Sequence, residues 1–270
     1  MTAFDFPLFV PADRPERISK AAASGADCVF IDLEDAVASQ AKASARIGLV
    51  QALAQLPAHP LPIFLRINAS GTPWHADDLA ALAILPVAGV VLPKAEHPED
   101  LKRLAAILGD RARVVALVES ASGLAQARLL ARSAGRLAFG SIDFAADLGC
   151  AHSREALLLA RLELVLASRL AGLPGPIDGV TTAIDRPDEI LDDAAHAASL
   201  GFAGKLLIHP RQIIPARQGF APSEADVNWA RRVLDAAGDG AAIALDGAMV
   251  DAPVIARARQ IIARSASRPH

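Results

Sequence analysis

One repeat restricts the fold of this chain more than any other feature. A short apolar run followed by a longer amphipathic stretch recurs eight times. We predict strands at residues 8–11, 28–33, 63–67, 89–92, 114–118, 137–139, 179–181 and 205–208. We predict helices at 15–23, 42–55, 76–85, 98–108, 123–133, 154–171 and 187–199. Strands that alternate with helices pair in parallel through crossover connections, and eight such units favour a closed α/β (β/α)₈ TIM barrel.

The chain continues beyond what the barrel needs. Another predicted helix spans 224–236, an Ala/Gly-rich stretch follows, and a last predicted helix spans 251–266. We therefore divide the chain into a catalytic barrel of residues 1–236 and a C-terminal helical extension of residues 237–270. The extension is a candidate lid or an element exchanged between subunits.

Composition excludes several classes of partner. The 270 residues are 53% hydrophobic, which is enough for a large packed core. A formal net charge of −3 gives no electrostatic reason to expect nucleic acid. No apolar run reaches the roughly 20 residues of a membrane span, and the first residues do not resemble a signal peptide. We therefore predict a cytoplasmic protein with neither a nucleic-acid nor a membrane partner.

Ionisable residues follow the predicted strands at the same end. The active sites of (β/α)₈ barrels gather at the C-terminal ends of the strands, so these residues are expected to meet at one mouth. In strand order they are Asp13 and Arg14, then Asp32, Glu34 and Asp35, then Arg66, Lys94, Glu119, Asp143 and, after the eighth strand, His209.

Several carboxylates at one barrel mouth raise one another's pKa unless a cation neutralises them. Oxygen ligands without clustered Cys or His select a hard ion, Mg²⁺ or else Mn²⁺. Glu119 and Asp143 follow adjacent strands and suit such a site. The alternative is that the acids form a buried ion-pair network with Arg66 and Lys94. We expect the other histidines, His152 among them, to lie on the surface.

At these residues the sequence resembles the aldolase/citrate lyase family (HpcH/HpaI type), in its citrate lyase beta-subunit-like and malyl-CoA lyase-like branch. The resemblance runs from Leu8 to about Ala263. The matching motifs are LFVP at 8–11, IDLEDAV at 31–37, LRIN at 65–68, LPK at 92–94, VESA at 118–121, FGSIDFAADLG at 139–149 and GFAGKLLIHP at 201–210.

The resemblance implies roles for individual residues. Glu119 and Asp143 would hold Mg²⁺, and Arg66 would bind a carboxylate or carbonyl oxygen of the substrate. Asp251, in the short motif MVD, would be an acid/base group that reaches a neighbouring subunit's site. Asp32, Glu34 and Asp35 would orient metal-bound water, and we count Glu34 and Asp35 among the catalytic residues. The substrate-binding set also contains Glu119 and Phe9, Arg14, Lys20, Ile142, Ile208 and His209.

The activity implied by the resemblance is metal-dependent cleavage of a carbon–carbon bond in a 3-hydroxyacyl thioester such as citryl-CoA, citramalyl-CoA or malyl-CoA. Two alternatives stay open: a non-catalytic or carrier-protein-dependent citrate lyase beta-type subunit, and a 2-keto acid aldolase that needs no coenzyme A. Asp35 stands where the pyruvate aldolases of the family carry His, which argues against the second alternative. By resemblance we expect a homotrimer or homohexamer. An acyl-carrier subunit would be a further partner under the first of these alternatives.

Overall fold

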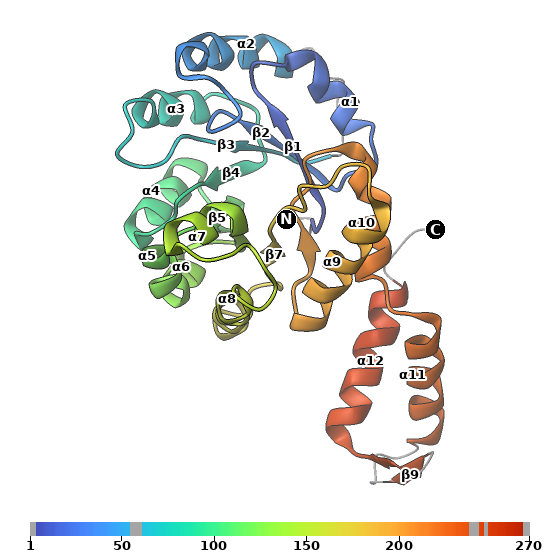
Figure 1. Ribbon diagram of the computed structural model, residues 1–270. Helices are drawn as coiled ribbons and strands as arrows, with labels where there is room; N and C mark the ends of the chain where they lie inside the picture. The colour runs from blue at the N-terminus through green and yellow to red at the C-terminus, as the bar shows by residue number, and fades with distance from the viewer. Residues whose placement is uncertain (1–3, 55–60, 238–242, 246–247, 267–270) are drawn as a thin grey trace.

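The computed structural model describes residues 4–54, 61–237, 243–245 and 248–266. Residue 55 of the second predicted helix and parts of the predicted extension lie outside these ranges. Eight parallel strands form one sheet in sequence order, with helices around it (Figure 1). The strands are β1 (Pro7–Pro11), β2 (Cys28–Asp32), β3 (Ile63–Arg66), β4 (Gly89–Leu92), β5 (Val114–Val118), β6 (Arg136–Phe139), β7 (Ile177–Asp178) and β8 (Gly204–Lys205).

The sheet closes between its first and last strands. Phe9 N donates to Leu207 O at 2.8 Å, and Leu207 N donates to Pro7 O at 3.0 Å. The interior is filled by a cluster in which Phe30 and Phe64 are fully buried and Phe4 packs beside both rings. A closed parallel sheet with a packed interior confirms the predicted TIM barrel.

Helices cover the outside of the barrel. Pro98 and Pro187 begin two of them, where the missing N–H breaks no helical bond, and Gly109 and Gly201 end the same two with positive φ. The helices are α1 (Ile18–Ala22), α2 (Lys42–Ala54), α3 (His75–Leu82), α4 (Pro98–Leu108), α5 (Ala121–Ala125), α6 (Ala127–Ser133), α7 (Ser141–Leu148), α8 (Leu158–Leu170), α9 (Pro187–Leu200) and α10 (Ile213–Phe220); short 3₁₀ turns η1 (Pro15–Arg17), η2 (Ser39–Ala41), η3 (Arg111–Arg113) and η4 (Pro210–Gln212) adjoin them.

Some predicted boundaries were wrong. The seventh strand lies at Ile177–Asp178, before the predicted 179–181, because Ile177 is the residue that fills the barrel and Gly179 already begins the loop. The eighth ends at Lys205, although Leu207 still bonds to β1. Two helices, α7 and α10, were not predicted. The short α7 falls inside the FGSIDFAADLG motif, which carries site residues. Gly140 and Gly149 lie at the two ends of the helix, so the segment resembles a loop in sequence.

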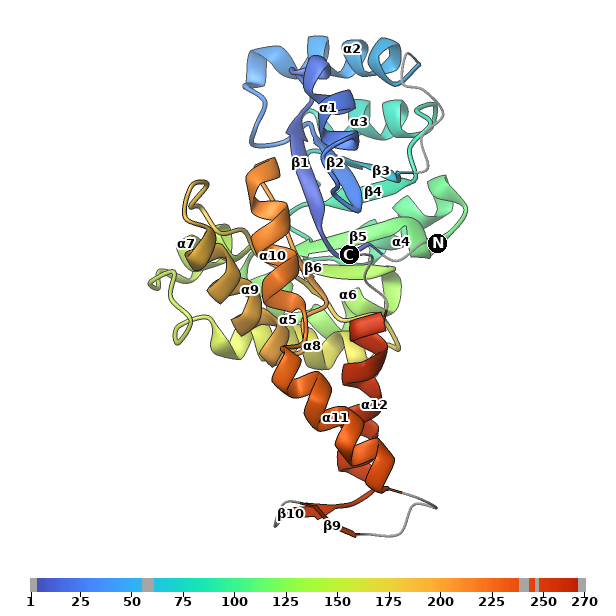
Figure 2. The same cartoon turned by 90° about the vertical axis from the view of Figure 1, so that its right-hand side faces the viewer.

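The C-terminal helices form a hairpin that projects from the barrel (Figures 1 and 2). Helix α11 (Glu224–Ala236) packs against α12 (Ala252–Ala266), with the strands β9 (Ile243–Leu245) and β10 (Ala248–Val250) at the tip. Ile255 and Ile261 of α12 are buried against Ala230 and Val233 of α11. Helix α11 therefore covers the apolar residues Ile255 and Ile261 of the last helix. The division after residue 236 stays a prediction, and these contacts lead us to propose a boundary before α11.

Within the described residues, no helix is both long and apolar enough to cross a membrane.

Candidate active site

Three acids and two bases at the ends of β2, β3 and β4 pair with one another. In the register of the sheet Asp32 lies beside Arg66. Arg66 Nε and Nη2 donate to the two carboxylate oxygens of Asp32 at 2.7 and 2.6 Å, and Arg66 Nη1 lies 3.0 Å from Glu34 Oε2. The guanidinium also stacks over Phe9, 4.8 Å from the ring centre. Burial lowers the pKa of Arg66, but the adjacent Asp32 outweighs it and raises the pKa overall.

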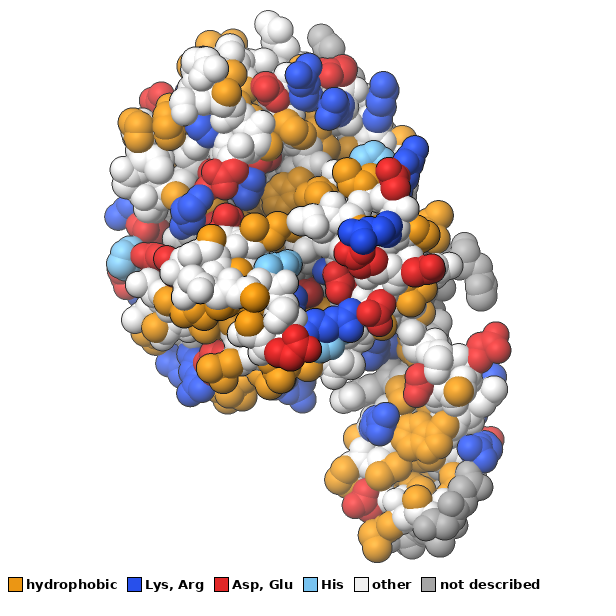
Figure 3. Space-filling model, in the orientation of Figure 1, with side chains coloured by type: hydrophobic (Ala, Val, Ile, Leu, Met, Phe, Trp, Pro, Cys, Tyr) orange, Lys and Arg blue, Asp and Glu red, His pale blue; other side chains and the backbone are white. Residues whose placement is uncertain are grey.

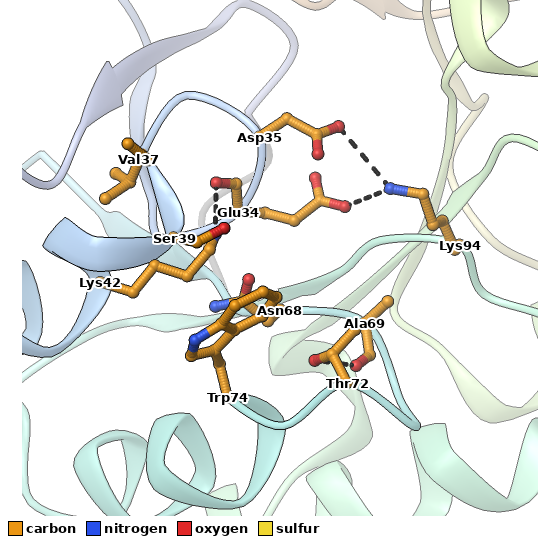
Figure 4. A pocket seen from close by; sticks show the side chains of 11 residues that line it. Glu34, Asp35, Val37, Ser39, Lys42, Asn68, Ala69, Thr72, Trp74 and Lys94 are labelled. Carbon is orange, nitrogen blue, oxygen red and sulfur yellow. Dashed lines mark hydrogen bonds and ion pairs between the residues drawn. The ribbon is translucent and has the colours of Figure 1, made fainter.

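Lys94 completes this network. Its ammonium group donates to Glu34 and lies 3.6 Å from Asp35 Oδ2 (Figure 4). Burial lowers the pKa of Lys94, but the hydrogen bond and charge of Glu34 outweigh it, so the pKa is raised overall. A lysine with a raised pKa is protonated at neutral pH, which disfavours a Schiff-base role. The ion pairs proposed as the alternative to a metal site are thus present, but they involve only the acids that follow β2.

Lys42 holds the backbone of the loop that carries these acids. Its buried ammonium donates to Leu33 O at 2.8 Å and to Glu34 O at 2.7 Å, and it lies over the ring of Trp74. Figure 4 shows Lys42 and Trp74 together on one side of the Glu34–Lys94 pair. The two bonds to backbone carbonyls hold Glu34 at the barrel mouth.

Glu119, directly after β5, is buried and forms no ion pair with any described residue. Its Oε1 accepts a hydrogen bond of 2.5 Å from Lys94 N, for which Lys94 adopts a left-handed backbone with φ 47°. A side chain at Gly140 would overlap the Glu119 carboxylate, so the glycine is needed here. Burial, and next the charge of Glu34, raise the pKa of Glu119 to about 8.

Asp143 lies in the first turn of α7, half-buried and close enough to Glu119 for its charge to raise the pKa of that group. Both carboxylates line a cavity of about 290 Å³ at the barrel mouth. Phe9, Arg66, Ile142 and Ile208 line it as well, so these predicted substrate-binding residues do come together. In Figure 3 acidic and basic side chains lie next to one another beside a hollow in this face of the molecule.

A second cavity of about 450 Å³ adjoins the first and shares Phe9 and Ile208 with it. Lys20 and His209, both in the predicted substrate-binding set, line this cavity, and Arg17 adds a base that the sequence did not single out. His209 also caps η4, since its Nδ1 accepts from Arg211 N at 3.2 Å. Arg14 is exposed at the start of η1 and is not among the lining residues of either cavity.

Asp251 lies apart from these cavities. It precedes α12 at the tip of the projecting hairpin, where its Oδ1 accepts from Val254 N at 3.2 Å (Figure 2). Within one chain, the structure therefore does not bring Asp251 to Glu119 and Asp143.

The donor set at Glu119 and Asp143 fits one hard cation. Among the described residues no cluster of three or more His, Cys, Asp or Glu side chains is arranged as a metal site. The candidate protein ligands are therefore the two carboxylates of Glu119 and Asp143, which line one cavity. Mg²⁺ commonly binds to one or two carboxylates and completes its octahedron with water and substrate oxygens. Glu119 is buried beside Asp143 with its pKa raised to about 8, and a bound cation would favour the charged form of both carboxylates.

Comparison with known proteins fits this geometry. The family model HpcH/HpaI aldolase/citrate lyase matches residues 6–210. A citrate lyase subunit beta-like protein of Mycobacterium tuberculosis is 38% identical over 268 residues, covering 96% of this chain and 94% of that protein. The mitochondrial citramalyl-CoA lyase of Homo sapiens is 28% identical over 291 residues, covering 96% of this chain and 85% of that protein. The chain belongs to the HpcH/HpaI aldolase/citrate lyase family, and the predicted class of metal-dependent lyase is confirmed.

A solved structure agrees over the whole length. The crystal structure of CitE from Mycobacterium tuberculosis in complex with magnesium, acetoacetate and coenzyme A superimposes with a TM-score of 0.88 at 37% identity, covering 98% of this chain and 99% of that chain. Another structure of the citrate lyase beta subunit from this organism holds oxaloacetate and magnesium, with a TM-score of 0.72 at 37% identity, covering 82% of this chain and 98% of that chain. Magnesium in these relatives agrees with the predicted cofactor.

Proposed function

We propose that this protein is a magnesium-dependent carbon–carbon lyase that cleaves a 3-hydroxyacyl thioester such as citramalyl-CoA, citryl-CoA or malyl-CoA. One observation carries the proposal. The acids at the end of β2 form ion pairs with Arg66 and Lys94, whereas Glu119 and Asp143 form no ion pair within the described residues. Those two carboxylates are therefore the pair available to a metal, and Glu119 and Asp143 are the ligands we propose.

The two adjoining cavities support a thioester substrate. The cavity with Glu119 and Asp143 fits a short carboxylated acyl group. Arg17 and Lys20 give the second cavity two cationic side chains that suit the phosphates of coenzyme A, and Phe9 and Ile208 form the apolar passage between the cavities. The relative that binds magnesium, acetoacetate and coenzyme A together supports this division.

The side chains of this site would share the work of cleavage. Bound magnesium would supply Lewis acidity at a carbonyl oxygen of the substrate. Arg66 uses Nε and Nη2 for Asp32 and Nη1 for Glu34. Nη1 and Nη2 each carry a second hydrogen, and these are the donors that we assign to a substrate carboxylate. Glu34 and Asp35, held by Lys94, would orient water at the metal.

Cleavage also needs an acid/base group. The base removes the proton of the 3-hydroxyl group, the bond between the α and β carbons breaks, and the electron pair is left on the thioester as an enolate that is then protonated. We assign this role to Asp251 of a second copy, because the projecting hairpin keeps Asp251 away from its own cavities. This assignment requires an oligomer, with a trimer or hexamer expected.

An activity screen tests the proposal. Metal-stripped protein is incubated with citryl-, citramalyl-, malyl- and hydroxymethylglutaryl-CoA, with and without Mg²⁺, and the acyl-CoA products are separated. We expect Mg²⁺-dependent cleavage of at least one thioester, and none with Glu119→Gln. If the protein cleaved only free 2-keto acid aldols and none of the thioesters, it would be a coenzyme A-independent aldolase and the proposal would be wrong.

A carrier-dependent subunit is the second candidate. It is favoured by relatives named citrate lyase subunit beta, such as that of Escherichia coli, which is 34% identical and covers 96% of this chain and 92% of that protein. Activity that appears only after an acyl-carrier protein is added would decide for it.

A further inference from the structure

His152 is exposed in the loop after α7, yet its ring reaches back to the beginning of that helix. His152 Nε2 lies 3.0 Å from the hydroxyl of Ser141. Ser141 is buried, lines the cavity with Glu119, and is the first residue of α7. Asp143 follows two residues later in the same turn. Through His152, the loop after α7 therefore contacts the first turn of the same helix, which also carries Asp143.

The Ser141 hydroxyl is confined from a second side by Gly179. A Cβ atom at residue 179 would overlap Ser141 Oγ, so the loop after β7 approaches the serine as closely as backbone allows. Lys205 Nζ donates to Gly179 O at 2.7 Å, and Lys205 in turn lies 3.5 Å from Asp178. Asp178 accepts from Arg161 Nε at 3.0 Å. A buried ion-pair network thus holds Gly179 in place against Ser141.

Asp143 itself has less support. No hydrogen bond or ion pair to its carboxylate is found within the described part of the chain. The position of this carboxylate is set by the backbone of the first turn of α7, and that turn is fixed by Ser141. We propose that His152 is a positioning residue, which acts through Ser141 to hold Asp143 where the metal binds. This inference depends on the proposed role of Asp143 as a ligand.

The charge state of the histidine is compatible with such a role. The residue as a whole is exposed, but its ring is partly desolvated where Nε2 faces Ser141. This desolvation, together with the nearby charges of Arg161 and Lys205, lowers the pKa of His152, so the ring is neutral at neutral pH. A neutral imidazole forms one hydrogen bond with a hydroxyl group, as donor or as acceptor, and adds no positive charge beside the proposed metal site.

The test compares variants of His152 by Mg²⁺ titration calorimetry. His152→Ala is expected to weaken Mg²⁺ binding about two- to tenfold, the equivalent of one neutral hydrogen bond. His152→Gln places an amide nitrogen near the position of Nε2 and is expected to restore binding to within about twofold. His97→Ala is the matched control, because His97 is exposed before α4 and its side chain makes no capping bond there.

A double variant shows whether His152 acts through the serine. If it does, Ser141→Ala with His152→Ala binds Mg²⁺ as Ser141→Ala does, within about twofold. Multiplying effects in the double variant would overturn the proposal, as would a His152→Ala protein that melts earlier than wild type and binds Mg²⁺ equally well.

Amide hydrogen exchange adds a readout that needs no metal. The amides of residues 144–147 donate the first hydrogen bonds of α7, and they should exchange about two- to tenfold faster in His152→Ala than in His97→Ala. Wild-type protein that binds no Mg²⁺ would refute the proposed function, and the positioning role would then be judged on exchange alone. Unchanged exchange in this turn would refute the positioning role.

Discussion

Binding of Mg²⁺ should release a proton from Glu119. The pKa of this carboxyl is raised to about 8 by burial and then by the charge of Glu34, so at pH 7 the group is about nine-tenths protonated. Metal binding needs the carboxylate, which means that the proton must leave. We expect about 0.9 proton released per Mg²⁺ at pH 7 and about 0.1 at pH 9. The apparent Kd for Mg²⁺ should correspondingly tighten about tenfold between these two pH values.

Calorimetry in buffers of different ionisation enthalpy measures the released proton directly. Glu119→Gln, which keeps the shape of the side chain and the acceptor for Lys94 N, should bind no Mg²⁺ and release no proton. In metal-free protein the same carboxyl makes the stability of the fold depend on pH. A carboxyl whose folded pKa is raised stabilises the fold fully below pH about 4.5, and this contribution is lost as the pH rises towards about 8. An affinity for Mg²⁺ that is constant from pH 7 to 9, with no proton release, would refute the reasoning.

Three further predictions concern single side chains. Glu119→Gln and Asp143→Asn should each lose Mg²⁺ binding in calorimetry while keeping their circular dichroism spectra; unchanged binding in both variants would show that the ligands are wrong. Arg66→Lys loses the planar fork shared by Asp32 and the substrate, and should lower kcat/KM by about 10- to 150-fold, the equivalent of about 1.5–3 kcal/mol; kinetics near wild type would remove Arg66 from the site. Asp251→Ala should abolish turnover and leave Mg²⁺ binding intact, and mixing it with Arg66→Ala should restore part of the activity; a mixture that exchanges subunits and recovers none would assign Asp251 to a structural role.

The barrel could be predicted because its strands are buried on both faces. Runs such as 28–31 and 114–118 are continuously apolar, and each is followed by an acid, Asp32 or Glu119, that the closed sheet brings to one mouth. The strands β7 and β8 were placed less accurately, because each has only two residues and so gives little apolar signal. Glycine does not mark the boundary either, since Gly204 lies within β8 whereas Gly179 lies in the loop after β7. Helix α7 is short and lies inside a site motif. Several of its residues are therefore set by the needs of the site, and they do not give the apolar periodicity of a helix.

The sequence places the candidate site residues at one mouth of the barrel but does not predict how they pair. That acids and bases meet follows from their places after the strands. Which acid pairs with which base depends on the register of β2 against β3, which sets Asp32 beside Arg66, and on the left-handed backbone of Lys94. Neither is visible as a pattern in the sequence. His152 was expected to lie on the surface, and it is exposed, but its bond to Ser141 depends on the path of the loop after α7.

Metal-dependent thioester cleavage tests the central claim most directly. Wild type and Glu119→Gln are stripped with EDTA and given citramalyl-CoA with and without Mg²⁺, and the acetyl-CoA released is measured by mass spectrometry. We expect acetyl-CoA from wild type with Mg²⁺ only, and none above background from the variant. Equal release by wild type with and without Mg²⁺, or by Glu119→Gln, would contradict the assignment of a magnesium-dependent lyase centred on Glu119 and Asp143.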